Sequence, residues 1–470
     1  FSTYVGDSAP RFILLFDPSA PEDGHGQMII VTTGNDVRDD VRSELDQFIA
    51  DKYPDARAHT RLITTGPPSD YPVMFRLIGE DNKKTAELAG KALDIMRKNP
   101  DIVNASLDWP EEMPSIKLKI NQDRVRELGM QFGLWFEPEM INLDSDVARA
   151  HPEWIMSTGD RLPVPSRSQQ VINLGIAECY AYIRDAMSAL IAEYGIDYIK
   201  WDHNRDLIDA GTQPSGRPGV HEQTLATYRL MDELKAAHPG LEIESCSSGG
   251  ARVDLGILER TDRVWVSDCI DPLDRQQMLR WTTQLLPPEL MGSHVASTTS
   301  HTTGRTLGLT VRASTAMFGH MGVEWNLLEA SAEERADLAA WIALHKELRH
   351  LLHTGRVVHV DHPDAGWSVH GVVSADKDDA VFSLMRVATS PVRPGPAIAL
   401  PGLDADADYR LEELLPDGVR SPVEYDPRFP ESWAWWQEGV TLPGRILSGV
   451  GLRFPDLMPE HAVLVRLTRA

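Results

Sequence analysis

The 470-residue sequence contains only three cysteines, Cys179, Cys246 and Cys269, and has no long apolar run. A small, odd number of cysteines provides no disulfide framework and is typical of a reducing compartment. No stretch approaches the roughly 18 apolar residues that a membrane-spanning helix needs. The first residues, Phe-Ser-Thr-Tyr, lack a basic segment followed by an apolar core, so no secretory signal is visible and we expect a cytoplasmic protein. The absence of an initiator Met predicts that the chain begins within a longer protein.

Basic residues are also few relative to acidic ones. The chain has 46 Lys and Arg residues against 70 Asp and Glu residues, which gives a net charge of −24. This balance disfavours nucleic acids and anionic membranes as partners. The length is sufficient for about three domains.

The most informative motif is YIKWDHNR at 198–205. Its apolar lead-in predicts a short buried strand, and Asp202 stands where that strand ends. Catalytic side chains of β/α barrels lie at the C-terminal ends of the strands. A carboxylate beside Lys200, which would hold it ionised, is a candidate nucleophile, and an ordinary strand-end ion pair is the alternative.

Three further segments end in polar residues in the same way, and they span 132–140, 241–252 and 264–271. Strands that alternate with helical stretches of 15 or more residues predict a parallel α/β barrel. Asp268, in the third segment, would be a second carboxylate at the mouth of that barrel. Hydrolysis of a glycoside with retention requires two such carboxylates, one as nucleophile and one as acid/base.

Five motifs resemble glycoside hydrolase family 36, the retaining α-galactosidases. They are GLWFEPEMIN (133–142), YIKWDHNR (198–205), ESCSSGGARVD (244–254), WVSDCIDPLDR (265–275), and MGSHV followed by HTTGRT (291–306). The resemblance implies that Asp202 is the nucleophile and Asp268 the general acid/base. Asp271 is the alternative acid/base because it follows closely in the same loop. The implied substrate is an α-galactoside oligosaccharide, and no cofactor is implied.

The same resemblance implies a galactose pocket lined by Trp135, Arg167, Lys200, Asn204, Cys246 and Gly249. Several of these residues also have a purely structural interpretation. Trp135 could pack in the barrel wall, Cys246 could be a small buried apolar residue, and Arg167 could be a solvated loop cation.

Two other groups of polar residues are left out of the predicted catalytic set. His294 and His301 have no Cys or carboxylate at zinc-like spacing, so we predict no metal site. The acids Glu137 and Glu139 could form a strand-end ion pair. His203 stands where the family usually has Met, and we interpret it as a wall residue.

The residues before 131 differ from the family pattern. A family member should carry a β-rich N-terminal domain and two more barrel strands, the second ending in paired aspartates, and neither is visible. We therefore expect an incomplete (β/α)8 TIM barrel with severely reduced or absent turnover. The segment instead predicts an α+β split-βαβ (ferredoxin-like) fold. Its predicted strands span 11–16, 27–32, 61–65, 73–78 and 115–120, and its predicted helices span 35–52, with Asn35 as the cap, and 82–98.

Four stretches of this segment resemble the porter region of resistance-nodulation-division efflux transporters. They are FSTYVGDSAPRF (1–12), VTTGNDVRDDVR (31–42), TTGPPSDYPVMFRLIGED (64–81) and VNASLDWPEEMPSIKLKINQDRVRELGM (103–130). In those transporters the region is a soluble extramembrane subdomain, which would lie on the periplasmic side of a membrane. Residues 1–130 are thus predicted to be a fused transporter fragment. A non-catalytic transporter fragment, or an α-glycosidase of another specificity, is the alternative function.

The remaining chain divides into a partial barrel at 131–354 and a C-terminal domain at 355–470. A helix over 332–352, ended by Gly355, is the predicted last barrel helix. Short β-like runs follow and predict an antiparallel β-sandwich. They span 356–360, 367–373, 380–385, 397–400 and 462–467. The aromatic run at 433–436 is interpreted as packing, and the family resemblance implies a possible homo-oligomer.

Overall fold

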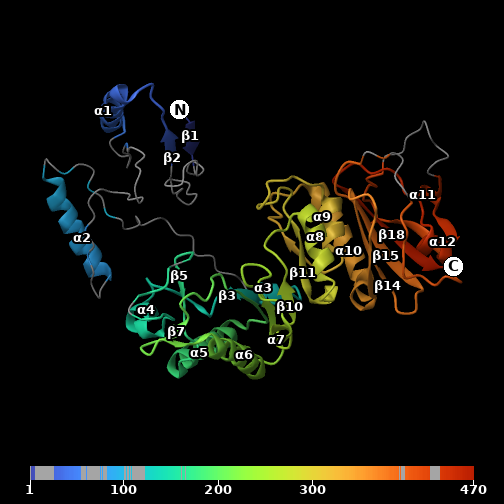
Figure 1. Cartoon of the computed structure of the whole chain (residues 1–470), viewed down its shortest axis with the longest axis horizontal. Helices are drawn as coiled ribbons and strands as arrows, with labels where there is room; N and C mark the ends of the chain where they lie inside the picture. The colour runs from blue at the N-terminus through green and yellow to red at the C-terminus, as the bar shows by residue number, and fades with distance from the viewer. Residues whose placement is uncertain are drawn as a thin grey trace. The chain divides into compact units, whose positions relative to one another are not determined.

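A computed structural model describes most of the chain from residue 122 onward and parts of the segment before it (Figure 1). The chain separates into two compact units, residues 1–119 and 120–470. The described residues are 2–5, 26–53, 60, 75, 77, 82–99, 102, 105, 107, 122–159, 161–164, 166–390, 392, 397–423 and 434–470.

The first unit contains a two-stranded antiparallel sheet and two helices. Strand β1 (Ser2–Val5) pairs with β2 (Gly26–Ile29), and the helices are α1 (Asn35–Lys52) and α2 (Asn82–Arg97). Both predicted helices are confirmed. The predicted Asn cap of the first helix is wrong, because Gly34 occupies the N-cap position and no side chain caps the helix. The predicted strands over 11–16, 61–65, 73–78 and 115–120 lie almost entirely outside the described residues.

The second unit begins with a parallel sheet of six strands in the order β12-β11-β10-β9-β6-β3. The strands are β3 (Gly133–Phe136), β6 (Tyr198–Trp201), β9 (Glu242–Ser245), β10 (Arg263–Trp265), β11 (Met291–Ala296) and β12 (His320–Glu324). In this sheet β3 and β12 are the outer strands. The described residues therefore form the incomplete barrel that the sequence predicts.

Helices connect the successive parallel strands, as such crossovers require. They are α3 (Gln122–Glu127) before the sheet, then α5 (Ala177–Tyr194), α6 (Val220–Ala237), α7 (Leu255–Leu258), α8 (Pro272–Thr282), α9 (Leu309–Ala316) and α10 (Ala332–Thr354). Shorter elements are β4 (Met140–Asn142), α4 (Asp146–Ala150), η1 (Pro152–Trp154), β5 (Gln169–Val171), β7 (Gly211–Thr212), β8 (Arg217–Pro218) and η2 (Pro288–Leu290).

Side chains alternate between the two faces of the sheet and separate its core from its polar face. On β6, Ile199 and Trp201 are fully buried, whereas Tyr198 and Lys200 are only partly buried. Ile199 and Trp201 belong to an apolar cluster that includes Ile191 and Leu230 of the covering helices. Successive residues of a strand point to opposite faces, so Lys200 lies on the face away from this core. That face carries the candidate site.

The C-terminal part is a six-stranded antiparallel sheet in the order β13-β14-β15-β18-β16-β17. Figure 1 shows α9 and α10 beside it. The strands are β13 (Arg356–Val360), β14 (Trp367–Val373), β15 (Asp379–Arg386), β16 (Asp408–Leu414), β17 (Val440–Pro443) and β18 (His461–Arg469), with short helices α11 (Ala434–Glu438) and α12 (Gly444–Gly449).

Most of the strand predictions for this part are confirmed. Four of the five predicted runs are strands, whereas 397–400 is wrong because it contributes only an isolated bridge between Ile398 and Leu452. The strands β16 and β17 were missed. The predicted packing role of the aromatic run holds for Trp436, which is buried against Trp435 and Phe454.

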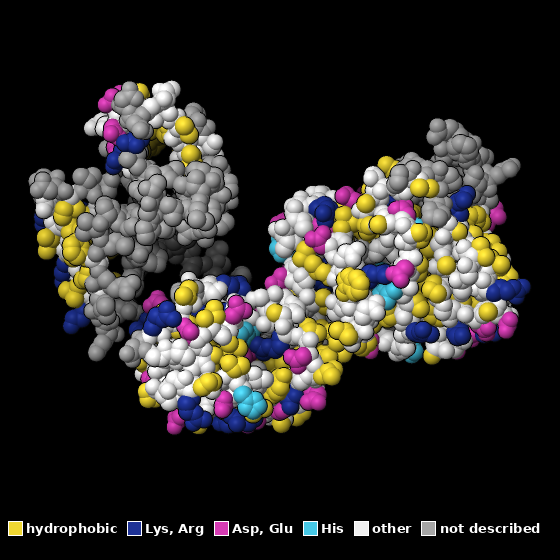
Figure 2. Space-filling view, in the orientation of Figure 1, with side chains coloured by type: hydrophobic (Ala, Val, Ile, Leu, Met, Phe, Trp, Pro, Cys, Tyr) yellow, Lys and Arg dark blue, Asp and Glu magenta, His cyan; other side chains and the backbone are white. Residues whose placement is uncertain are grey.

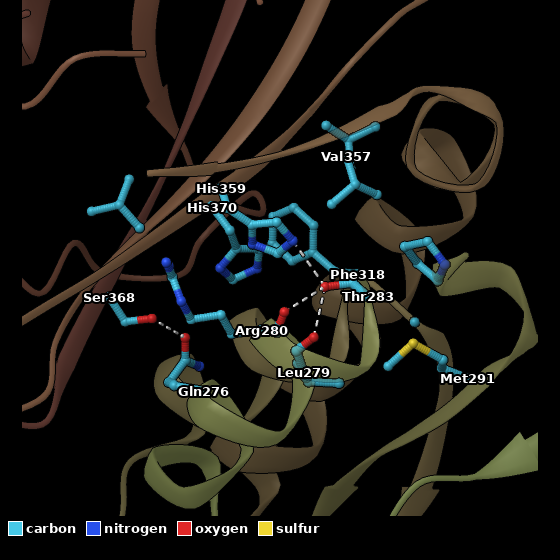
Figure 3. Close-up of a pocket in the computed structure, with 14 residues that line it drawn as sticks. Gln276, Leu279, Arg280, Thr283, Met291, Phe318, Val357, His359, Ser368 and His370 are labelled. Carbon is cyan, nitrogen blue, oxygen red and sulfur yellow. Dashed lines mark hydrogen bonds between the residues drawn. The ribbon is translucent and has the colours of Figure 1, made fainter. Parts of the chain in front are cut away.

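The junction between α8 and the C-terminal sheet encloses a cavity of about 30 Å³ (Figure 3). His359 and His370 are opposite each other on β13 and β14 and border this cavity. The Nε2 of His359 lies 3.0 Å from the Thr283 hydroxyl, while the His370 ring packs edge-on to Phe318. The volume admits one or two water molecules, so the cavity is part of the packing between the two layers.

Surface charge and helix character agree with the composition. Figure 2 shows Lys and Arg side chains interspersed with Asp and Glu over the described part of the visible face. Within the described part of the chain, no helix is both long and apolar enough to cross a membrane.

Candidate active site

Asp202 lies directly after β6 and is 6% exposed. Its Oδ2 accepts hydrogen bonds from Trp135 Nε1 at 3.0 Å and Asn204 Nδ2 at 2.6 Å. Its Oδ1 accepts from the backbone N–H groups of His203 at 2.8 Å and Ser248 at 3.3 Å. Both carboxylate oxygens are therefore held by donors from three strand ends.

These donors set the ionisation of Asp202. Burial alone raises its pKa, but the hydrogen bonds from Asn204, Trp135, Cys246 and the His203 backbone outweigh burial and lower the pKa below the ordinary 3.8. Hydrogen bonds to the charged form of a carboxyl group favour that form. Asp202 is thus a buried, ionised carboxylate, as a nucleophile must be.

Lys200 does not play the part predicted for it. Its ammonium group lies 3.6 Å from Glu244 Oε1 and 4.2 Å from the centre of the Trp265 ring. The low pKa of Asp202 comes from hydrogen-bond donors. Lys200 faces away from the strand core because side chains alternate, so it meets Glu244 of the neighbouring strand at the same register position.

Cys246 and Asn204 are buried beside Asp202. Burial and the neighbouring Asp202 carboxylate raise the pKa of the Cys246 thiol to about 12, so this thiol is a neutral donor. Asn204 also donates to Glu137 Oε1 at 2.5 Å and accepts from Ser248 Oγ at 3.1 Å. Glu137 therefore helps to orient the Asn204 amide.

Asp268 lies in the loop after β10, where two side chains fix its position. Trp265 Nε1 donates to Asp268 Oδ1 at 3.0 Å. The buried Arg275 donates to the backbone oxygens of Ser267 and Cys269, each at 2.8 Å. The indole therefore holds one of the two carboxylate oxygens of Asp268.

The loop after β9 brings the two carboxylates to one place. Its Ser248 N–H reaches Asp202, and Gly249 packs on the backbone of Asp268. A Cβ at Gly249 would lie 3.1 Å from the Asp268 nitrogen, and Gly249 has a φ of +84°. Glycine is the residue that fits this position because it tolerates both the contact and the left-handed backbone.

Asp271, the alternative acid/base, is the N-cap of helix α8. It is fully buried and caps α8 by accepting from the Leu273 N–H at 2.9 Å. Burial raises its pKa, but hydrogen bonds from Thr303 and Arg305 outweigh that effect and lower it overall. A group kept ionised by an arginine is unsuited to donate a proton. The geometry therefore favours Asp268.

A cavity of about 410 Å³ opens on the same face. Trp135, on the outer strand β3, is 52% exposed, so an aromatic surface remains available near Asp202. In the described part of the chain, no group of three or more His, Cys, Asp or Glu side chains is placed to hold a metal ion. The cavity is lined by Lys200, Trp265, Asp268, His294, His301, Val323 and Glu324.

Arg167 is exposed on a turn with a φ of +52°. Arg205, which was not among the predicted site residues, holds this turn in place through the turn's backbone. It is buried and donates to the backbone oxygens of Gln169 and Val164, at 2.6 and 2.9 Å. Its position in the YIKWDHNR motif was the available signal.

Glu139 is a second residue whose role was underestimated. It is 3% exposed and accepts from Trp201 Nε1, Thr227 Oγ1 and Arg252 Nη1 at 2.8–3.0 Å. Burial raises its pKa, but Arg252 is the foremost of several groups that lower it overall. Glu139 ties the loops after β3 and β9 to helix α6 behind Asp202. Its neighbour His203 is buried, and burial lowers the pKa of that imidazole.

Comparison with known proteins identifies the family. Residues 100–355 match the melibiase family, and residues 367–467 match the C-terminal domain of glycosyl hydrolase family 36. An α-galactosidase from Escherichia coli is 39% identical over 348 residues, which are 74% of this chain and 49% of that protein. The α-galactosidase AgaA from Geobacillus stearothermophilus is 33% identical over 326 residues, 66% of this chain and 44% of that protein.

Solved structures agree. A crystal structure of AgaA from Geobacillus stearothermophilus in complex with 1-deoxygalactonojirimycin has a TM-score of 0.66 at 29% identity, covering 74% of this chain and 46% of that one. A complex of an AgaA variant with raffinose gives the same values. This chain spans about half the length of the curated relatives it matches. The chain belongs to the melibiase family and carries the C-terminal domain of glycosyl hydrolase family 36.

Proposed function

We propose that this chain hydrolyses terminal α-D-galactosyl residues of oligosaccharides with retention of configuration. The observation that carries the proposal is the buried Asp202 carboxylate, which four hydrogen bonds keep ionised, on the same face as Asp268. Family membership supports the substrate class. Raffinose and stachyose are bound in structures of the Geobacillus relative, which supports oligosaccharides as substrates.

The mechanism is a double displacement. Asp202 attacks the anomeric carbon while the bond to the aglycone oxygen breaks, and Asp268 Oδ2 gives its proton to that oxygen. In the second step Asp268 takes a proton from water, the water oxygen attacks the anomeric carbon, and Asp202 leaves as a carboxylate. For this chemistry the two carboxyl groups should lie about 5–5.5 Å apart.

The remaining predicted pocket residues have proposed roles that follow from their positions. Trp135 presents an exposed ring on which the sugar can stack, and its N–H stays on Asp202. Lys200 lines the cavity as a cation for sugar hydroxyl groups. Asn204, Cys246 and Gly249 shape the base of the pocket. Arg167 would reach the sugar only from the exposed turn that Arg205 anchors.

Hydrolysis of a nitrophenyl α-D-galactoside by the purified chain tests this proposal, with Asp202→Ala as the comparison. We expect slow turnover, because the described sheet is open between β3 and β12. Turnover should disappear in the variant. Equal release by both proteins would contradict a nucleophilic role of Asp202. A panel of other chromogenic α-glycosides, including the α-N-acetylgalactosaminide, tests the specificity.

For the N-terminal segment, we propose that residues 1–130 are a porter-like module of the resistance-nodulation-division type. The four sequence stretches and the two confirmed helices, α1 and α2, support this. The family match begins at residue 100 and the compact units divide at 119/120, so the boundary at 130 is itself a proposal. A crystal structure of the whole chain tests it. A porter-type split-βαβ arrangement is expected, and a galactosidase-type β-rich domain would contradict it.

Two further properties are proposals of the same kind. Three free cysteines support a reducing, cytoplasmic location, and fractionation of the native host tests it. A homo-oligomer follows from the family resemblance alone. Light scattering of the purified chain would show a multiple of 52.3 kDa if the proposal is correct.

A further inference from the structure

Two aromatic rings on the face of the parallel sheet that carries the candidate site lie over glycines of the neighbouring strand. Trp265 of β10 is at the register position of Gly292 of β11, and His294 of β11 is at that of Gly322 of β12. A Cβ at Gly292 would lie 2.9 Å from Trp265 Cε3, and a Cβ at Gly322 would lie 2.5 Å from His294 Cδ2. Each glycine therefore provides the space that the neighbouring ring fills.

The two rings contact each other, and Glu324 holds the second. The centres of Trp265 and His294 are 4.4 Å apart at an angle of 42°. Nδ1 of His294 lies 3.0 Å from Glu324 Oε2, at the end of β12. This hydrogen bond is the main reason that the pKa of Glu324 is lowered, so the carboxylate is charged where it holds the imidazole. His294 is thus fixed between Trp265, Glu324 and the backbone of Gly322.

Trp265 is confined by its other neighbours too. It is 2% exposed, and the ammonium of Lys200 and the guanidinium of Arg275 lie 4.2 and 4.9 Å from its ring centre. Its remaining polar contact is the hydrogen bond to Asp268 Oδ1. A cation is attracted to the face of an aromatic ring, so these two cations oppose rotation of the indole away from them. The imidazole of His294 completes this confinement on the side of β12.

We propose that His294 and Glu324 are positioning residues for the acid/base Asp268 and that they act through Trp265. Glu324 orients His294, His294 holds the indole plane, and the indole N–H keeps Asp268 Oδ1 occupied. Oδ2 is then presented to the aglycone oxygen. This inference rests on the proposed galactosidase function, because only there does Asp268 transfer a proton.

The kinetic test compares two substrates in the whole chain with His294→Asn or Glu324→Gln. An alkyl α-galactoside needs its leaving oxygen protonated, whereas a dinitrophenyl α-galactoside does not. We expect kcat/KM for the alkyl substrate to fall about 10-fold, and that for the dinitrophenyl substrate by less than about 3-fold, because general acid catalysis is the affected step. Equal losses on both substrates, or no loss, would overturn the positioning role.

The matched control is Glu153→Gln. His151 Nδ1 lies 3.0 Å from Glu153 Oε1, and the His151 ring stacks on the buried Trp154, so the same three residue types meet there. Breaking that pair should change neither substrate's kinetics. A loss there equal to the loss in Glu324→Gln would attribute the effect to general destabilisation and overturn the proposal.

A second readout does not require turnover. With 15N-labelled tryptophan, the indole N–H resonance of Trp265 is assigned by its disappearance in Trp265→Phe. Asp268→Asn should shift it, because the acceptor changes, and His294→Asn should shift or broaden it. An unchanged Trp265 resonance in His294→Asn refutes the positioning role. If the resonance responds while the unmodified chain hydrolyses neither substrate, the coupling stands and the proposed function fails.

Discussion

The packing of His370 predicts a specific loss of stability on acidification. Burial, followed by the nearby His359 and Arg280, lowers the pKa of His370 from 6.5 to about 4. Asp361, which forms an ion pair with Arg280, is an acidic group beside Arg280 and His359. The folded protein therefore binds fewer protons at this group than the unfolded chain between pH 4 and 6.5. Stability from this group is complete above pH 6.5 and is lost as pH falls toward 4.

The magnitude follows from the size of the shift. A displacement of 2.5 pKa units corresponds to about 3 kcal/mol when the loss is complete, since one unit is about 1.4 kcal/mol. Between pH 7.5 and 5.0, the part lost is about 2 kcal/mol by the same linkage relation. The cavity beside the ring in Figure 3 can admit a water molecule, which would solvate the charged form and reduce this value.

Hydrogen exchange of peptides from β13 and β14, corrected for the intrinsic pH dependence of exchange, measures this effect. The opening free energy of the unmodified chain should fall from pH 7.5 to 5.0, and protonation of His370 should account for about 2 kcal/mol of that fall. In His370→Asn this fall should be smaller by the same amount, because the titrating group is gone. His350→Asn, at an exposed position, is the control and should behave as the unmodified chain does. An equal pH dependence in His370→Asn and the unmodified chain would refute the reasoning.

Three other predictions concern the site. Asn204→Ala removes the strongest hydrogen bond that lowers the pKa of Asp202, so the acid limb of kcat/KM should move to higher pH by up to about one unit, as a pH–rate profile would show. Glu139→Ala leaves the half-buried Arg252 guanidinium and the buried Trp201 indole N–H without their carboxylate and should cost about 3 kcal/mol of stability in chemical denaturation. Asp271→Asn loses an ion pair and should lower stability by about 1–2 kcal/mol. It should nevertheless change kcat/KM for alkyl and dinitrophenyl galactosides by the same factor.

The sequence predicted those parts of the fold that have a regular local signal. The helix over 332–352 has apolar spacing and is observed as Ala332–Thr354, with a capping box between Ser331 and Glu334. Strand β16 was missed because Asp408–Leu414 contains Arg410, Glu412 and Glu413, whose charges obscure its alternation. The run at 397–400 is apolar, but among the described residues it forms an isolated bridge with Leu452 and pairs with no full strand.

For the site, local sequence indicated which residues converge but not which contacts they make. Asp202, Asn204 and Cys246 meet at the ends of β6 and β9. Lys200 and Asp202 are close in sequence, which suggested an ion pair between them. The register of β6 against β9 instead places Lys200 beside Glu244. Register depends on contacts between distant segments, and no local pattern specifies it.

The central claim is that Asp202 is the nucleophile of a retaining α-galactosidase site. Its most direct test is covalent trapping with a fluorinated galactosyl fluoride, followed by mass spectrometry of the digested chain. The account predicts one added fluorogalactosyl group on the peptide that contains Asp202, and none in Asp202→Ala. A folded chain that acquires no label, or that carries the label on another residue, would contradict the account.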